Sequence, residues 1–186
     1  MKRFLLWSFV LASFSACQNQ GGQTTSTESK PDTTKAAPAE EIHYAYTVDH
    51  PADNWDRGSQ KNVELVLNAL KAWETGNMDE SLKYFGDSVQ LSADHFDAKL
   101  SKDSLGAMFK RGRSDIASVQ IQMEDFESVI SKDKSHEYVG LWYIQKWTDK
   151  KGKTDSVYHM DDLRIKDGKI IGLDEKTRHY PAPAKK

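Results

Sequence analysis

Three short turn segments divide the second half of the chain into four long runs. The segments are Asp133-Lys134, 149–152 and Asp167-Gly168. Asp and Gly favour tight turns, and Asp-Gly between alternating residues is among the strongest short-range hairpin signals. The pattern therefore predicts a meander of four long antiparallel strands. The strands are expected at 116–130, 137–148, 154–166 and 169–179.

The residues before these strands have a helical pattern. Between 59 and 75, apolar side chains recur at spacings of three and four, which predicts an amphipathic helix ended by Gly76-Asn77. A second, short helix is expected between a cap at Asp79 and a stop at Gly86.

A third helix is expected over 101–111, after a short strand through Val89 and Leu91 and before Gly112. No helical pattern follows it. Three helices followed by a four-strand meander predict an α+β domain, in which one curved antiparallel sheet wraps around the three helices.

The N-terminus has the three zones of a secretory signal. Lys2 and Arg3 precede an apolar run that is too short for a membrane span of about 20 residues, and small residues follow. The end of the signal, Ser15-Ala16-Cys17, resembles the lipobox of bacterial lipoproteins. This resemblance implies removal of residues 1–16 and lipidation of Cys17. The alternative is an ordinary cleavage site beside an incidental thiol.

The segment behind Cys17 is predicted to be a disordered tether. Residues 18–41 contain no Val, Ile, Leu, Met, Phe, Trp or Tyr, so they cannot bury enough apolar area to offset chain entropy. The domain organisation is then a signal peptide at 1–16, a lipidated cysteine and tether at 17–42, a domain at 43–180 and a disordered tail at 181–186.

The predicted location is the cell envelope. Gln18 and Asn19 follow Cys17, so the aspartate that favours inner-membrane retention in some lipoproteins is missing. We therefore expect an outer-membrane lipoprotein that faces the periplasm or the cell surface. The membrane would serve only to anchor the protein through its lipid.

Charge and cysteine content exclude several kinds of site. The chain has 26 basic and 28 acidic residues without a basic block, which argues against nucleic acid as a partner. Its one cysteine excludes an internal disulfide framework and a cysteine-rich zinc site. No glycine-rich phosphate loop appears, so no cofactor is predicted.

Two segments resemble the SnoaL-like branch of the nuclear transport factor 2-like superfamily. Residues 66–89, VLNALKAWETGNMDESLKYFGDSV, resemble its opening, and residues 163–173, LRIKDGKIIGL, resemble its last hairpin. The resemblance covers about 60–180 and implies a cone-shaped, cystatin-like α+β roll with a pocket that opens between the helices. The family includes steroid isomerases, dehydratases and polyketide cyclases, but also binding and assembly modules, so the fold does not settle the function.

The turn at 149–152 predicts which residues face each other across the hairpin. Pairing Trp147 with Asp155 sets Tyr143 opposite His159 and Leu141 opposite Asp161.

We assign the odd-numbered face of the strand at 154–166 to the interior, because Leu163 and Ile165 need burial. Trp142, Ile144 and Met160 favour the other phase, and a slip of one residue would exchange the two faces.

With the odd face inside, His159 and Asp161 form a candidate catalytic acid/base pair, because a carboxylate in apolar surroundings can shuttle protons. The alternative is a polar pair with a structural role. The predicted ligand pocket consists of Trp73, Tyr84, Phe109 and Tyr143. For the helical aromatics among these, the alternative is an ordinary place in the core.

No metal site is predicted. His95 and Asp97, or His159 and Asp161, have suitable side chains, but no third ligand lies at a recognisable spacing.

Two functions from different classes remain. The first is a lipid-anchored binding or interaction module whose pocket holds a small apolar molecule. The second is a cofactor-free enzyme of the isomerase, cyclase or dehydratase type that uses the interior Asp/His pair. Large side chains occur on both faces of the predicted sheet, so we also expect a homodimer through its outer face.

Overall fold

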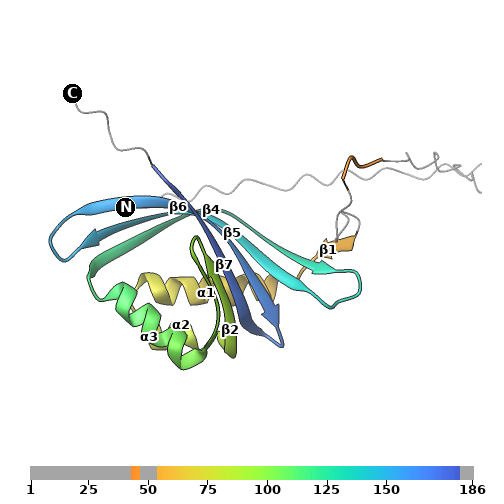
Figure 1. Cartoon of the computed structure of the whole chain (residues 1–186), viewed down its shortest axis with the longest axis horizontal. Coiled ribbons are helices and arrows are strands. Elements are labelled where there is room, and N and C mark those ends of the chain that lie inside the picture. The colour runs from red at the N-terminus through yellow and green to blue at the C-terminus, as the bar shows by residue number, and fades with distance from the viewer. Residues whose placement is uncertain (1–42, 47–53, 181–186) are drawn as a thin grey trace, which may run out of the picture. The chain divides into compact units, whose positions relative to one another are not determined.

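The computed structural model describes residues 43–46 and 54–180 (Figure 1). The chain divides into two units, residues 1–45 and 46–186, and every described helix and strand lies in the second. The predicted signal, Cys17, the tether and the tail lie outside the described residues, so these assignments stay predictions.

The described residues form three helices and seven strands. They are β1 (Trp55–Arg57), α1 (Gln60–Glu74), α2 (Met78–Leu82), β2 (Phe85–Ala93), β3 (Phe96–Ser101), α3 (Lys102–Arg113), β4 (Ile116–Ser131), β5 (Glu137–Asp149), β6 (Thr154–Lys166) and β7 (Lys169–His179).

All seven strands belong to one sheet, in the order β1-β4-β5-β6-β7-β2-β3. The pairs are antiparallel except for β2 and β7, which run parallel. The sheet is curved, and the three helices lie on one side of it (Figure 1). The predicted α+β class and the meander of four long strands are therefore confirmed.

The predicted register of the central hairpin is also confirmed. Trp147 pairs with Asp155, and this pairing sets His159 opposite Tyr143. The turn fixes the register because Oδ1 of Asp149 accepts hydrogen bonds from the backbone N–H of Lys151 at 2.8 Å and of Lys153 at 2.9 Å. The same carboxylate therefore holds both sides of the turn.

The odd-numbered face of β6 is the interior face, as predicted. Its buried residues are Val157, His159, Asp161, Leu163 and Ile165, whereas Met160, Asp162 and Arg164 are exposed. Trp142 and Ile144, which favoured the opposite phase, are half-buried on the outer face. Their aromatic and aliphatic surface is therefore covered only in part.

The segment around α2 differs from the prediction. Asn77, and not Asp79, caps α2, since its Oδ1 accepts from the N–H of Glu80 at 3.2 Å. Gly86 does not end a helix but lies in β2, which begins at Phe85. The strand starts at Phe85 because this residue pairs with Ile170 of β7, and its side chain is buried in the core, where it is 4% exposed.

Two short strands, β1 and β3, were not predicted. β3 returns along β2 through a turn in which Asp94 has a φ of +35°. α3 also extends past Gly112, which was expected to end it. The next residue, Arg113, stabilises this helix end, because its guanidinium donates hydrogen bonds to the carbonyls of Glu74 and Ile116, both at 3.2 Å.

The core lies between the helices and the sheet face that they cover. Its buried members on the helices are Val63, Val66, Ala69 and Leu105, and those on the strands include Val89, Val139, Leu141, Leu163 and Ile170. Among the described residues, no helix combines the length and the apolar character that a membrane crossing requires.

Candidate functional site

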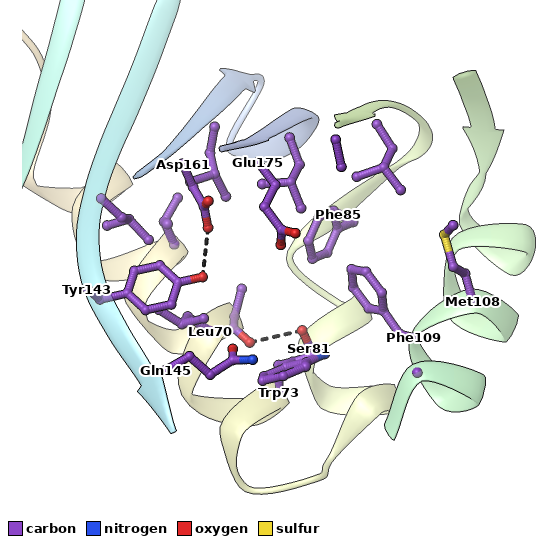
Figure 2. Close-up of a pocket in the computed structure, with 18 of the residues that line it drawn as sticks. Leu70, Trp73, Ser81, Phe85, Met108, Phe109, Tyr143, Gln145, Asp161 and Glu175 are labelled. Atoms are coloured by element: carbon purple, nitrogen blue, oxygen red, sulfur yellow. Dashed lines mark hydrogen bonds between the residues drawn. The ribbon is translucent and has the colours of Figure 1, made fainter. Parts of the chain in front are cut away.

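A cavity of about 350 Å³ lies between the helices and the sheet. Most of its wall is apolar and aromatic. The apolar lining includes Leu70, Trp73, Phe85, Phe96, Met108, Phe109, Leu141 and Leu173. Figure 2 shows the side chains of Asp161 and Glu175 projecting from the sheet at the top of the view and that of Trp73 at the opposite end, with Phe109 on the side of the helices. The cavity therefore has an apolar body and an acidic end.

Most of the predicted pocket residues line this cavity. Trp73, Phe109 and Tyr143 do so, but Tyr84 is not among the lining residues. Tyr84 is half-buried and packs against the core just before β2 begins. The next residue, Phe85, lines the cavity in place of Tyr84. Its ring packs edge to face against that of Phe109, with centroids 5.6 Å apart.

Asp161 is the buried carboxylate of the acidic end. It is 6% exposed, and its Oδ2 accepts a hydrogen bond of 2.7 Å from the hydroxyl of Tyr143 (Figure 2). Burial, followed by the charge of Asp161 and this hydrogen bond, holds the pKa of Tyr143 well above its usual value. Tyr143 therefore remains a neutral donor to the carboxylate.

His159, the other predicted catalytic residue, is buried but is not a lining residue of the cavity. Its ring stacks on Tyr143, with centroids 4.7 Å apart and planes 4° from parallel. Its Nδ1 lies 3.7 Å from Oδ1 of Asp161. That distance is longer than a hydrogen bond. The structure thus brings the predicted pair together without joining it directly.

Glu175 is a site residue that the sequence reasoning missed. It faces Asp161 across the β6–β7 pair and lines the cavity, with its side chain 36% exposed. Its Oε2 lies 3.6 Å from Nδ1 of His159. Burial first, and then the charge of Asp161, raise the pKa of Glu175 above its ordinary value, while His159 acts in the opposite direction.

A β-bulge decides that Glu175 points inward. The β6–β7 register shifts between Arg164 and Ile165, so that Ile170 pairs with Ile165 but Gly172 pairs with Arg164. Without this extra residue, counting from the turn would set Asp174, and not Glu175, opposite Asp161. In the sequence, only the Asp167-Gly168 turn indicates how β6 and β7 pair, and it does not reveal the bulge that turns Glu175 inward.

The bulge also corrects the expectation that His159 and Asp161 lack a third potential metal ligand. Donor atoms of His159, Asp161 and Glu175 all lie within 4.8 Å of one another. The other pair considered, His95 and Asp97, does not belong to any such group of three within 43–46 and 54–180. Asp97 instead accepts a hydrogen bond from the Ser92 hydroxyl at 3.0 Å.

Comparison with solved structures identifies the fold. An NTF2-like protein of unknown function from Burkholderia pseudomallei matches with a TM-score of 0.52 and 14% identity, over 63% of this chain and 91% of that one. An LEH-like epoxide hydrolase from M. tuberculosis matches with a TM-score of 0.53 and 11% identity, over 64% and 84%.

A third match is a protein with a ketosteroid isomerase-like fold from Catenulispora acidiphila, solved with trimethylamine. Its TM-score is 0.50 and its identity 15%, over 61% of this chain and 84% of that one. No family model and no curated protein matches the sequence. The domain thus has the α+β fold of NTF2-like proteins, as the sequence resemblance implied, and the function must be argued from the cavity.

Proposed function

We propose that this domain binds a small, largely apolar molecule in the cavity, with a polar group of that molecule directed to Asp161 and Glu175. The observation that carries the proposal is an apolar cavity that ends on two carboxylates. Its volume of about 350 Å³ lies in the range typical of small-molecule sites, roughly 300–1,000 Å³. The apolar wall supplies affinity, and the few polar groups set the orientation.

The contents of the cavity can be tested without knowledge of the ligand. Small molecules that co-purify with the full-length chain are extracted and identified by mass spectrometry. We expect a compound enriched with the wild type and depleted in Phe109→Ala, which removes part of the wall. A matched control is Phe126→Ala, because Phe126 is 41% exposed and does not line the cavity. Equal recovery from both variants would contradict the proposal.

The alternative function is a cofactor-free enzyme of the isomerase, cyclase or dehydratase type. Two carboxylates that reach one apolar cavity favour it, since such groups can accept and return a proton. Asp161→Asn separates the two functions because it nearly preserves shape. An enzyme that uses this base would lose turnover of its substrate, whereas a binding module would keep most of its affinity.

We also propose that the domain lies in the cell envelope, on a lipid attached to Cys17. The secretory signal and the polar segment behind the cysteine support this. Expressed with its signal, the chain should partition into the detergent phase. Cys17→Ser should release or misprocess it, and unchanged partitioning of that variant would rule out the anchor.

We further propose a homodimer through the outer sheet face. Met160, which is 38% exposed, pairs there with the half-buried Trp142, so apolar surface remains open to a partner. Sedimentation of the full-length chain in detergent should show a dimer that Met160→Lys weakens. A strict monomer at tens of micromolar would contradict it.

A further inference from the structure

We propose that His159, Asp161 and Glu175 form a binding site for one divalent transition-metal ion, such as Zn²⁺, at the acidic end of the cavity. The three residues come from the neighbouring strands β6 and β7. This site goes beyond the proposed function, because an ion can bind here whether or not the cavity holds an organic molecule.

The first support is convergence of the donor atoms. Nδ1 of His159 lies 3.7 Å from Oδ1 of Asp161 and 3.6 Å from Oε2 of Glu175. A metal ion about 2.1 Å from each of two such atoms would join them at an angle of roughly 120°. That angle is close to tetrahedral or trigonal coordination. Glu175, which is partly exposed, has the freedom to close the third side.

The second support is that the buried groups lack partners. Both ring nitrogens of His159 and Oδ1 of Asp161 are buried, and none of them has a hydrogen-bond partner within 43–46 and 54–180. The side chains are only 5% and 6% exposed. Buried polar atoms are nearly always satisfied, so Nδ1 of His159 and Oδ1 of Asp161, which face each other without partners, favour a bound species between them. Nδ1 of His159 does not hydrogen-bond either carboxylate directly, since its distances of 3.6–3.7 Å to their oxygens are too long.

The third support is the way in which Asp161 is held. Tyr143 donates to Oδ2 of Asp161, which leaves Oδ1 free on the side that faces His159. The Tyr143 ring also stacks on the imidazole. Outer partners of this kind orient metal ligands in many proteins, and their loss weakens metal binding. Tyr143 is therefore a positioning residue for both ligands.

The chemistry of the donors selects the kind of ion. One imidazole nitrogen with two carboxylate oxygens suits zinc and its neighbours in the first transition row, whereas Mg²⁺ and Ca²⁺ prefer oxygen donors alone. Two carboxylates also balance the charge of a divalent ion. Because Glu175 and Asp161 line the cavity, the remaining coordination positions would face it.

The test measures metal binding directly. The full-length chain, prepared without a histidine tag and treated with a chelator, is titrated calorimetrically with Zn²⁺, and Co²⁺ absorption reports the coordination. We expect one ion for each chain. His159→Ala and Glu175→Gln should each weaken Zn²⁺ binding at least about tenfold, and Tyr143→Phe about tenfold with the stoichiometry retained.

The matched controls are His179→Ala and Glu127→Gln, which alter exposed residues of β7 and β4 and should leave binding unchanged. Glu175→Gln is close in shape and partly exposed, so it keeps the test valid if His159→Ala does not fold. Absence of saturable binding, or equal weakening by the control variants, would overturn the proposal. Either result would leave the binding of an organic molecule to the chelator-treated cavity as a separate observation.

Discussion

Removal of one hydroxyl group, in Tyr143→Phe, probes the hydrogen bond that holds the acidic end together. Tyr143 is 3% exposed and donates to Oδ2 of Asp161 at 2.7 Å. The other oxygen of Asp161 has no hydrogen-bond partner, so the variant leaves a buried carboxyl group without any partner among the described residues. The free energy of unfolding should therefore fall.

The expected loss follows from the type of bond. A hydrogen bond to a charged group contributes roughly 1.5–3 kcal/mol, and the burial of Asp161 favours the upper part of that range, about 2–3 kcal/mol. Each kcal/mol lowers the melting temperature by about 2–4 °C, so we expect a decrease of roughly 4–12 °C.

The assay is urea and thermal unfolding of the chelator-treated chain, followed by circular dichroism. Tyr158→Phe is the matched control, because Tyr158 lies on the outer face of β6, where its ring contacts the guanidinium of Arg178. Loss of the Tyr158 hydroxyl should have the smaller effect. A change below about 0.5 kcal/mol in Tyr143→Phe would show that this hydrogen bond does not stabilise the fold, since surface substitutions without a structural role produce changes of that size.

Two further predictions concern a glycine contact and a turn. A Cβ on Gly58 would lie 2.9 Å from the backbone of Ser128, so Gly58→Ala should lower the free energy of unfolding by about 1–3 kcal/mol in urea titrations. A Cβ on Gly112 would meet no atom within 4 Å, so the control Gly112→Ala should raise the free energy of unfolding by about 0.5–1 kcal/mol. Hydrogen bonds from Ser131 and then Ser135 hold the pKa of Asp133 well below its usual value. The ionised carboxylate therefore stabilises the fold above about pH 4. This stabilisation is lost as the pH falls through the pKa of the folded state. Asp133→Ala should therefore be less stable than the wild type at pH 7, with a gap that narrows in strong acid; a gap that is constant with pH would contradict the role of the charge.

The sheet could be predicted wherever a turn fixed the register. Asp149 holds the β5–β6 turn through its own side chain, so counting outward from this turn placed His159 and Asp161 on the interior face. Leu163 and Ile165 agreed with that phase. Local turn chemistry and hydrophobic alternation pointed to the same answer here, and the prediction was right.

Glu175 could not be predicted because the bulge near Ile171 has no clear local signal. Simple alternation from Ile170 would put Asp174 inside and Glu175 outside, whereas the structure does the reverse. At the bulge, a Cβ on Gly172 would lie 3.1 Å from that of Arg164, a tight contact that glycine avoids. Such packing depends on the neighbouring strand and not on the local sequence.

The error at Tyr84 has a similar origin. Two aromatic residues stand side by side in the sequence, and only one of them can point into the cavity from the start of β2. The backbone N–H of Ile170 donates to the carbonyl of Tyr84 at 2.9 Å, which joins this segment to β7. This long-range contact sets the phase and turns Phe85 inward.

Titration with an apolar fluorescent probe tests whether the cavity is a small-molecule site. N-phenyl-1-naphthylamine should bind the full-length chain once and gain fluorescence. Loss of the Phe109 ring removes an aromatic contact of about 0.5–1.5 kcal/mol and its buried area, so Phe109→Ala should bind the probe roughly tenfold more weakly. Phe126→Ala should match the wild type. Equal affinity for all three proteins, or no saturable binding to the wild type, would show that the cavity is not a small-molecule site.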